Sequence, residues 1–177
     1  MTNEQPTLHL ISGLPGSGKT TYAEDLRADT HAVLFSIDRW LVTAYGQYSL
    51  SEVGQEEHTR RVLACRDLIW ASAAELLGRA THVILDDGFF LREHRRRYVA
   101  MAAAIGARAT IHYIHAPLLV IRRRLERRNR HLPPHNFYID PDVLIGFLGL
   151  YEVPSAEEGA ELVPVSTGVD QPELDVH

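Results

Sequence analysis

The chain has 177 residues, is 45% hydrophobic and 23% charged, and carries a formal net charge of −5. This length is typical of one domain with a substantial core, and the composition is that of an ordinary globular protein. The chain has no apolar run of membrane-spanning length, no apolar signal core near Met1 and a lone cysteine, Cys65, so we expect neither a membrane protein nor a disulfide scaffold. We expect a single cytoplasmic domain over 1–177.

The first predicted element is a short buried strand, 8–11, and a glycine-rich stretch follows it directly. Residues 13–20 match the pattern of Gly, four residues, then Gly-Lys-Ser/Thr, and a helix is predicted from Thr21 to Arg27. A strand, a turn and a helix N-terminus gather unpaired N–H groups around one point, which favours a bound phosphate. The residues predicted to bind a nucleoside triphosphate are Gly13, Leu14, Pro15, Gly16, Ser17, Gly18, Lys19, Thr20 and Thr21.

Two side chains of this stretch have predicted roles of their own. Lys19, the only lysine beside seventeen arginines, is expected to reach the outer phosphates, because a compact ammonium fits between phosphate oxygens. The Thr20 hydroxyl is expected to hold Mg²⁺. The expected ligands are therefore ATP and Mg²⁺, although the absence of a visible base-reading motif leaves GTP open as the donor.

Strand and helix patterns alternate along the rest of the chain. Strands are predicted at 32–37, 81–85, 109–114 and 162–165, and helices at 55–78, 92–105, 117–129 and 141–151. Residues 130–138 contain two prolines and are predicted to form a loop, and 168–177 are expected to be a frayed tail. This alternation predicts an α/β fold with a parallel sheet covered on both faces and ligands at the carboxyl ends of its strands.

The kind of phosphate-loop protein follows from elimination and then from motifs. A GTPase would need an Asn-Lys-x-Asp motif, which cannot exist without a lysine after Lys19, and large motor or transporter ATPases need longer domains, so a compact kinase remains. The segments 12–20, 36–38, 85–89, 124–129 and 151–154, in this order, resemble a family of predicted AAA-type ATP-binding kinases. Related to that family are polynucleotide kinase, zeta toxin and chloramphenicol phosphotransferase.

The resemblance covers a core of 8–165. It implies a P-loop three-layer α/β/α sandwich whose five parallel strands follow the order 2-3-1-4-5. It also implies an arginine-bearing lid at about 130–138.

Three aspartates follow predicted strands. Asp38 comes directly after the second strand, and in the resembled kinases an aspartate there accepts the proton of the attacking hydroxyl; a helix N-cap is the alternative. Asp86 ends an apolar strand, as a Mg²⁺-organising carboxylate does, and we favour it for the metal. Its neighbour Asp87 points to the opposite side, where it would serve the acceptor pocket or merely a turn.

The predicted helix at 117–129 carries a cluster of arginines. The resemblance assigns ATP and transition-state contacts to Arg124 and Arg128, which lie four residues apart on one helical face. The other arginines of the cluster, and Arg95, Arg96 and Arg97 of the preceding helix, are interpreted as solvated charge.

The acceptor pocket is less clear. Arg39 lies beside the proposed base, and an apolar wall could be formed by Trp40, Tyr45, Tyr48, Phe89 and Phe90, although these rings could equally pack a small helical cap. The polynucleotide kinase pattern places an arginine where this chain has Leu41, which argues against a nucleic-acid 5′ end as acceptor.

The favoured function is an ATP- and Mg²⁺-dependent phosphotransferase acting on a small-molecule hydroxyl, such as that of a nucleoside, sugar or antibiotic. Residues 92–130 hold eleven arginines and two acids, so a polynucleotide 5′-hydroxyl kinase or RNA-repair module is one alternative. An ATP-binding regulatory or toxin-like protein with little turnover is another. The acceptor and the oligomeric state are left open.

Overall fold

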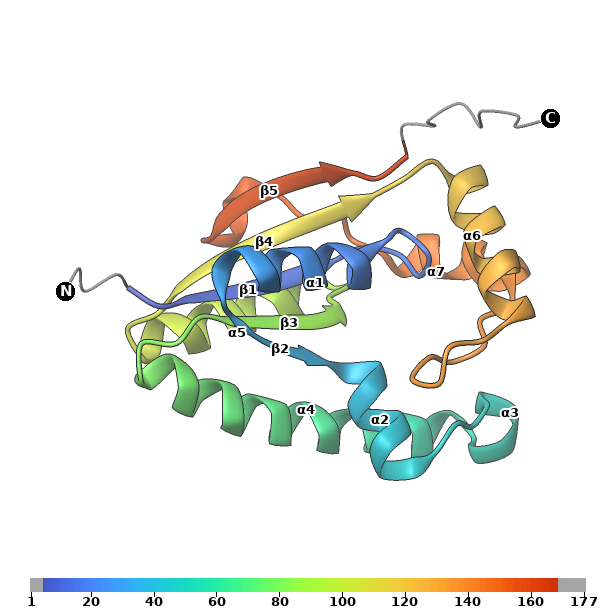
Figure 1. The fold of residues 1–177 in the computed structure, drawn as a ribbon, viewed down its shortest axis with the longest axis horizontal. Helices are drawn as coiled ribbons and strands as arrows, with labels where there is room; N and C mark the ends of the chain where they lie inside the picture. Colours follow the sequence, from blue (N-terminus) through green and yellow to red (C-terminus); the bar gives the residue numbers. More distant parts are fainter. Residues whose placement is uncertain (1–4, 169–177) are drawn as a thin grey trace.

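The computed structural model describes residues 5–168, and Figure 1 shows its five parallel strands side by side in the order β2-β3-β1-β4-β5. The strands are β1 (Thr7–Ser12), β2 (Val33–Ser36), β3 (Val83–Gly88), β4 (Arg108–His115) and β5 (Glu161–Ser166). The α/β class and the strand order are both confirmed. The tail predicted to fray lies, apart from Gly168, outside the described residues.

The helices are α1 (Lys19–Thr30), α2 (Ile37–Tyr45), α3 (Leu50–Val53), α4 (Gln55–Gly78), α5 (Arg92–Ala104), α6 (Leu118–Arg130) and α7 (Leu144–Leu150). Short 3-10 turns lie at Pro141–Val143 and Ala156–Glu158. Helix α4 has the predicted bounds. The sequence analysis placed Ile37 at the end of a strand, but there the chain already turns into α2.

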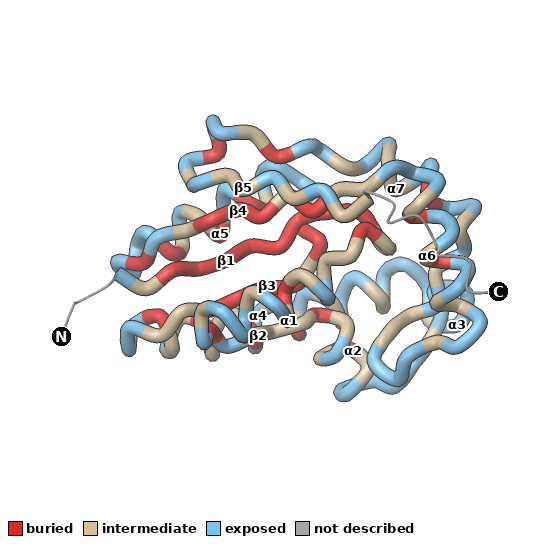
Figure 2. The backbone as a smooth tube through the Cα atoms, turned by 45° about the horizontal axis from the view of Figure 1, so that its top comes forward, coloured by how far each residue is buried: buried red, intermediate tan, exposed pale blue. Residues whose placement is uncertain are grey.

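The helices cover the two faces of the sheet unequally. Helices α4 and α5 pack on one face, where Ile69 and Ala102 join sheet residues such as Leu10 in the larger core. On the other face α1 packs Ala23 against Ile11. Figure 2 shows that the buried backbone follows the central strands, while the outer surfaces of the helices are exposed. None of the helices in the described range has the length and apolar character that crossing a membrane requires.

A chain of polar side chains crosses the interface between α1 and the sheet. The Tyr22 hydroxyl lies 2.8 Å from Nδ1 of His112, whose Nε2 lies 3.0 Å from Nδ1 of His9. Burial lowers the pKa of each histidine to about 4, and for His9 the neighbouring His112 adds to the effect. The two imidazoles are therefore neutral at physiological pH, and they satisfy each other within the core.

A buried ion pair joins α5 to the segment before β5. Arg95 is fully buried and donates two hydrogen bonds to Glu158, at 2.7 and 2.8 Å. Its remaining nitrogen, Nη1, donates to the carbonyl oxygen of Phe89 at 2.8 Å. The interpretation of Arg95 as solvated charge is wrong. Its neighbours Arg96 and Arg97 are exposed as predicted.

We predict that the two buried histidines make the fold less stable in acid. In the unfolded chain each histidine has a pKa near 6.5, so between pH about 6.5 and about 4 the unfolded state binds more protons than the folded state. The free energy of unfolding is highest above this pH window and decreases as the pH falls through it. At pH 5 the decrease is on the order of 2 kcal/mol per histidine. Other charged or titratable groups near His9 are His82, Arg108 and Glu161.

Urea unfolding at pH 7.5 and pH 5.0 measures this loss. The double variant His9→Gln, His112→Gln should lose much less stability between the two pH values than the wild type does. The exposed His131→Gln is the matched control and should behave as the wild type. Equal losses in the wild type and the double variant would contradict the assignment.

We also predict that Glu158→Gln destabilises the fold by about 3–5 kcal/mol, because it leaves the Arg95 guanidinium buried without its counter-charge. Chemical denaturation measures the change. Glu157→Gln, an exposed neighbour, serves as the control. A loss below 1 kcal/mol in Glu158→Gln would contradict the claim that Glu158 neutralises the buried Arg95 guanidinium.

Candidate active site

The glycine-rich stretch forms a compact turn between β1 and α1. The backbone N–H of Ser17 donates to the Leu14 carbonyl at 3.1 Å, and the Lys19 ammonium donates to the same oxygen at 2.8 Å. Gly18, immediately before α1, has a backbone φ of 97°, a value that residues other than glycine rarely adopt. The turn therefore holds its amides and the start of α1 around one point, as an anion requires.

Helix α6 supports this turn from outside. A Cβ atom on Gly16 would lie 3.0 Å from Cγ of Leu125, which is tighter than ordinary van der Waals contact, so a side chain here would crowd the helix. Arg124 donates to the hydroxyl of Thr167 at 2.9 Å and to its carbonyl at 2.5 Å. The Thr167 hydroxyl in turn donates to the Ser17 carbonyl at 2.6 Å. Arg124 is thus fixed against the glycine-rich turn by the residue that follows β5.

A bulge at the end of β3 sets the positions of the adjacent aspartates. Ile11 pairs with Asp86, but the next residue of β1, Ser12, pairs with Gly88, so Asp87 is the extra residue. The Asp86 carboxylate accepts a hydrogen bond from the Thr20 hydroxyl at 2.9 Å. Burial raises the pKa of Asp86, and Lys19 opposes this shift. A hydroxyl and a carboxylate side by side form an oxygen-donor pair of the kind that Mg²⁺ prefers.

Asp87 points the other way, toward α4. It accepts two hydrogen bonds from the Arg66 guanidinium, at 2.6 and 2.7 Å, in a bidentate pair. The predicted opposite orientation of the two carboxylates is what the structure shows. Asp87 lies within β3 and not in a turn, and its place in an acceptor pocket stays a prediction.

Asp38 occupies the second position of α2, at the same edge of the sheet. The residue before the helix is Ser36, so the interpretation of Asp38 as an N-cap is wrong. Burial raises the pKa of Asp38 to about 6, the neighbouring carboxylate Asp86 adds to this, and Lys19 and Arg128 oppose it. The Asp38 carboxyl group therefore interacts electrostatically with Lys19 of the glycine-rich turn and with the Asp86 carboxyl group.

Arg128 lies one helical turn beyond Arg124 and faces a different partner. Burial lowers its pKa, and the Asp38 carboxyl group opposes this shift. Its Nε is buried without a hydrogen-bond partner among the described residues, while Nη2 makes one long contact of 3.4 Å to the Phe137 carbonyl. Of the two predicted arginines, Arg124 is hydrogen-bonded within the protein, whereas Arg128 keeps free donor capacity.

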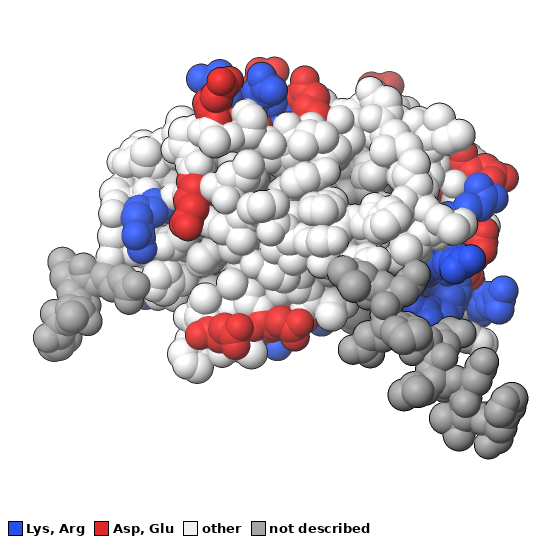
Figure 3. Space-filling view, turned by 90° about the horizontal axis from the view of Figure 1, so that it is seen from above, with Lys and Arg blue, Asp and Glu red and all other residues white. Residues whose placement is uncertain are grey.

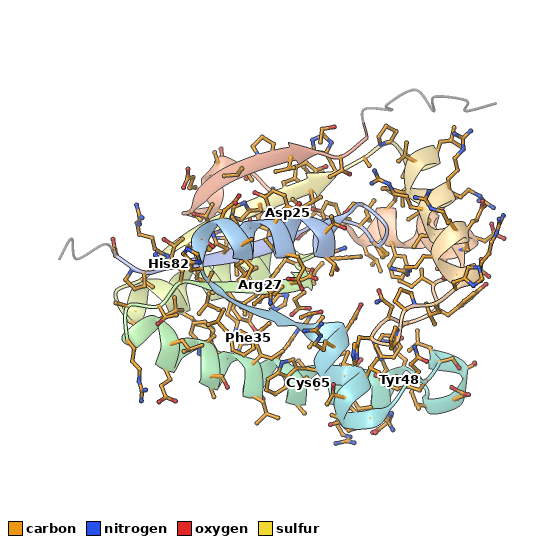
Figure 4. All side chains as sticks on the ribbon, in the orientation of Figure 1. Asp25, Arg27, Phe35, Tyr48, Cys65 and His82 are labelled. Carbon is orange, nitrogen blue, oxygen red and sulfur yellow. The ribbon has the colours of Figure 1, made fainter. Side chains whose placement is uncertain are left out.

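A cavity of about 210 Å³ opens beside Asp38. Its walls include Thr20, Ser36 and Arg39 on one side and residues 133–136 of the loop after α6 on the other. Gln47, from the turn after α2, holds that loop by donating to the Asn136 carbonyl at 2.9 Å and more weakly to the Pro133 carbonyl at 3.4 Å. The Tyr48 ring packs on Phe137 at a centroid distance of 5.0 Å, and Figure 4 shows Tyr48 next to this loop.

The rings of the predicted aromatic wall lie in different surroundings. Phe89 is only 1% exposed and packs against Tyr98 in the core, so its assignment to the substrate pocket is corrected. Trp40 is partly buried and lies against Phe35, at a centroid distance of 6.1 Å. Trp40, in α2, is therefore packed, as the alternative expected, whereas Phe89 belongs to the main core and Tyr45 is exposed. Arg39 is exposed and does line the cavity.

Several contacts of the site could not be read from the sequence. Thr167, Arg66 and Gln47 have no motif of their own, and each acts through a partner at least 21 positions away. Tyr151 is the exception: it lies in segment 151–154 of the family resemblance, and its hydroxyl lies 2.8 Å from that of Ser12.

The remaining arginines of α6 lie on the outside of the molecule. Arg122, Arg123, Arg127 and Arg130 are exposed, as predicted for solvated charge. In Figure 3 basic side chains gather at the end of the molecule where α6 lies, and the middle of the face shown is nearly free of charge. Arg122 also pairs with Glu126 and Asp142 on the surface.

Comparisons with known proteins agree with this geometry. A family model described as the AAA domain matches residues 8–152. The fold is similar to that of a candidate kinase from Chloroflexus aurantiacus, with a TM-score of 0.73, 20% identity, and coverage of 94% of this chain and 93% of that chain. The fold is also similar to that of Kti12 from Chaetomium thermophilum, solved in complex with ADP-AlF3. Its TM-score is 0.66 and its identity 19%, with coverage of 93% of this chain and 91% of that chain.

A gluconokinase from Sinorhizobium meliloti gives a TM-score of 0.59 and 17% identity, with coverage of 92% of this chain and 83% of that chain. A comparison with curated protein sequences gives no match. At these identities, the solved structures establish a shared fold.

Proposed function

The chain belongs to the AAA-domain family of P-loop kinases, and from this premise we propose that it transfers the γ-phosphate of ATP to a hydroxyl group of a small molecule. One observation carries the proposal: the Thr20–Asp86 pair, Lys19 and Asp38 meet at one edge of the sheet, and Thr20 and Asp38 line one cavity. One neighbour of the same fold was solved in complex with ADP-AlF3, which supports a nucleotide as the ligand.

The residues fit a nucleotide and its metal ion. The turn that contains Gly16 and Gly18 would hold the phosphates, and Lys19 would bind the outer ones in place of its present bond to the Leu14 carbonyl. Thr20 and Asp86 would hold Mg²⁺, which neutralises charge on the phosphate oxygens when it is bound. These roles keep the sequence-based assignments of Thr20, Asp86 and Lys19.

Asp38 would act on the acceptor. In the transfer, the acceptor oxygen forms a bond to the γ-phosphorus, its proton passes to the Asp38 carboxylate, and the bond between that phosphorus and ADP breaks. A carboxyl group with a pKa of about 6 is a stronger base than an ordinary aspartate and is still largely ionised at neutral pH.

Arg124 and Arg128 of α6 would have different roles. Arg128, whose Nε has no hydrogen-bond partner among the described residues, would stabilise the charge that spreads over the migrating phosphoryl group. Arg124 would act as a positioning residue, because its guanidinium is fixed to Thr167 and the Ser17 carbonyl.

We predict that Asp38→Asn lowers kcat by about 10²–10⁴-fold, the usual contribution of a general base, while ATP affinity changes less than threefold. The assay is acceptor-dependent ADP formation across nucleosides, sugars, aminoglycosides and a 5′-hydroxyl oligonucleotide. Asp25→Asn, an exposed aspartate on α1, is the control and should keep full activity.

Three outcomes would contradict parts of this proposal. Full activity of Asp38→Asn would remove its role as base. Preferred use of the oligonucleotide, falling steeply with salt, would favour the polynucleotide kinase alternative. Tight ATP binding with no transfer to any acceptor would favour a regulatory protein.

We further predict that Arg128→Gln lowers kcat at least 100-fold, in the direction of the loss seen when an arginine finger is removed. Arg124→Gln should instead weaken ATP binding, because the glycine-rich turn loses its support from the residue after β5. Steady-state kinetics and ATP titrations separate the two effects. The same kcat defect in both variants would show that the arginines act together.

A further inference from the structure

The cavity beside Asp38 sets a limit on the size of the acceptor. At about 210 Å³ it is smaller than the roughly 300–1,000 Å³ of pockets for drug-sized ligands. The transferred phosphoryl group must share this space, since Thr20 lines the same cavity. The room left beside Asp38 therefore fits a few carbon and oxygen atoms.

The loop that closes the cavity is fastened on the acceptor side. Gln47 donates its side-chain amide to two carbonyls of residues 133–136, and Tyr48 packs on Phe137 directly after them. Both partners come from the turn between α2 and α3. This Gln47 contact keeps the loop over Asp38, so a bulky acceptor would have to break it.

Basic side chains near the acceptor side are already engaged. Arg66 is held by the bidentate bond to Asp87. Arg61 donates to Glu57 at 2.7 Å, and its guanidinium lies over the Tyr45 and Tyr48 rings, 4.8 and 4.7 Å from their centroids. A carboxylate or phosphate that bound Arg61 or Arg66 would have to displace one of these partners.

Three residues after Asp38, where the polynucleotide kinase pattern has an arginine, this chain has the apolar Leu41. Leu41 is 2% exposed and belongs to the core, so it offers no charge to the cavity. Asp38, Asp86 and Asp87 bring three carboxyl groups to this edge of the sheet, so an anionic acceptor would add negative charge where it is already concentrated. Arg39 also lines the cavity, and its exposed guanidinium is the group that could bind an acidic acceptor.

We propose that the acceptor is a small polyol or sugar that carries no acidic group. The cavity takes it by size and the Gln47 contact encloses it. Arg61 and Arg66 are engaged within the protein and Arg128 is assigned to the transferred phosphoryl group, so Arg39 is the cation in the cavity lining left to meet a carboxylate or phosphate. This inference rests on the proposed kinase activity and narrows its substrate class.

Matched acceptor pairs test the charge requirement. We would measure ADP formation with Mg²⁺ and ATP for an aldose against its aldonic acid, and for a polyol against its monophosphate, at constant ionic strength. The uncharged member of each pair should show at least a tenfold higher kcat/KM, in the wild type and in Arg39→Gln alike.

The possible outcomes distinguish a failure of this inference from a failure of the proposed kinase activity. Preference for the acidic member, lost in Arg39→Gln, would overturn the inference, leave the kinase activity standing and assign acid binding to Arg39. Transfer to no member of either pair, with ATP still bound, would overturn the inference; if the broad acceptor panel were silent too, the proposed function would fall with it.

The Gln47→Ala variant tests the size requirement. It should raise KM for the preferred small acceptor at least fivefold and admit larger alcohols, while the Kd for ATP changes less than twofold. Gln55→Ala is the matched control, because within residues 5–168 the side chain of this exposed glutamine bonds only the nearby Thr59 hydroxyl, at 3.3 Å. Unchanged acceptor kinetics in Gln47→Ala, at an unchanged Tm, would overturn the restriction to small acceptors.

Discussion

The pairing of β1 with β3 is the constraint on which the rest of this structure depends. The two strands run parallel, so the glycine-rich turn after β1 and the aspartates at the end of β3 emerge at one edge. The backbone N–H of Gly13 bonds the Gly88 carbonyl at 3.0 Å, which fastens the two strand ends together just beyond the bulge. Without the extra residue Asp87, the pairing would place only one carboxylate at this point and leave Arg66 of α4 without its partner.

A second framework holds this edge from behind. The Phe89 carbonyl accepts hydrogen bonds from the Ser12 hydroxyl and from the buried Arg95, while Glu158 holds Arg95 in turn. Phe89 itself has a φ of 43°, an unfavourable value for a bulky residue that only a fixed environment maintains. The buried ion pair thus serves geometry as much as stability, since it keeps the chain beyond Asp87 in a shape that an isolated strand end would not adopt.

The sequence predicted well what depends on local pattern. The turn at 13–20, the full length of α4 and the class of the fold follow from spacing and periodicity, and the strand order came from the family resemblance. It failed where a distant partner decides. Arg95 stands in a run of three arginines that looks solvated, and only Glu158, 63 positions away, shows that it is buried. Helix α2 was missed because Ile37 continues an apolar strand pattern, and Phe89 looked available because its burial depends on α5.

The solitary lysine gives the chain an unusual chemical property. Every other side-chain cation is a guanidinium, so Lys19, bonded to the Leu14 carbonyl within the glycine-rich turn, is the one side-chain amine in the sequence. Burial lowers its pKa, which favours the neutral, nucleophilic form of the amine. Acylation of any lysine in this protein is therefore acylation of the proposed phosphate site, and a lysine-specific protease has one peptide bond to cut, inside the same turn. Modification at that amine reports directly on what occupies the loop.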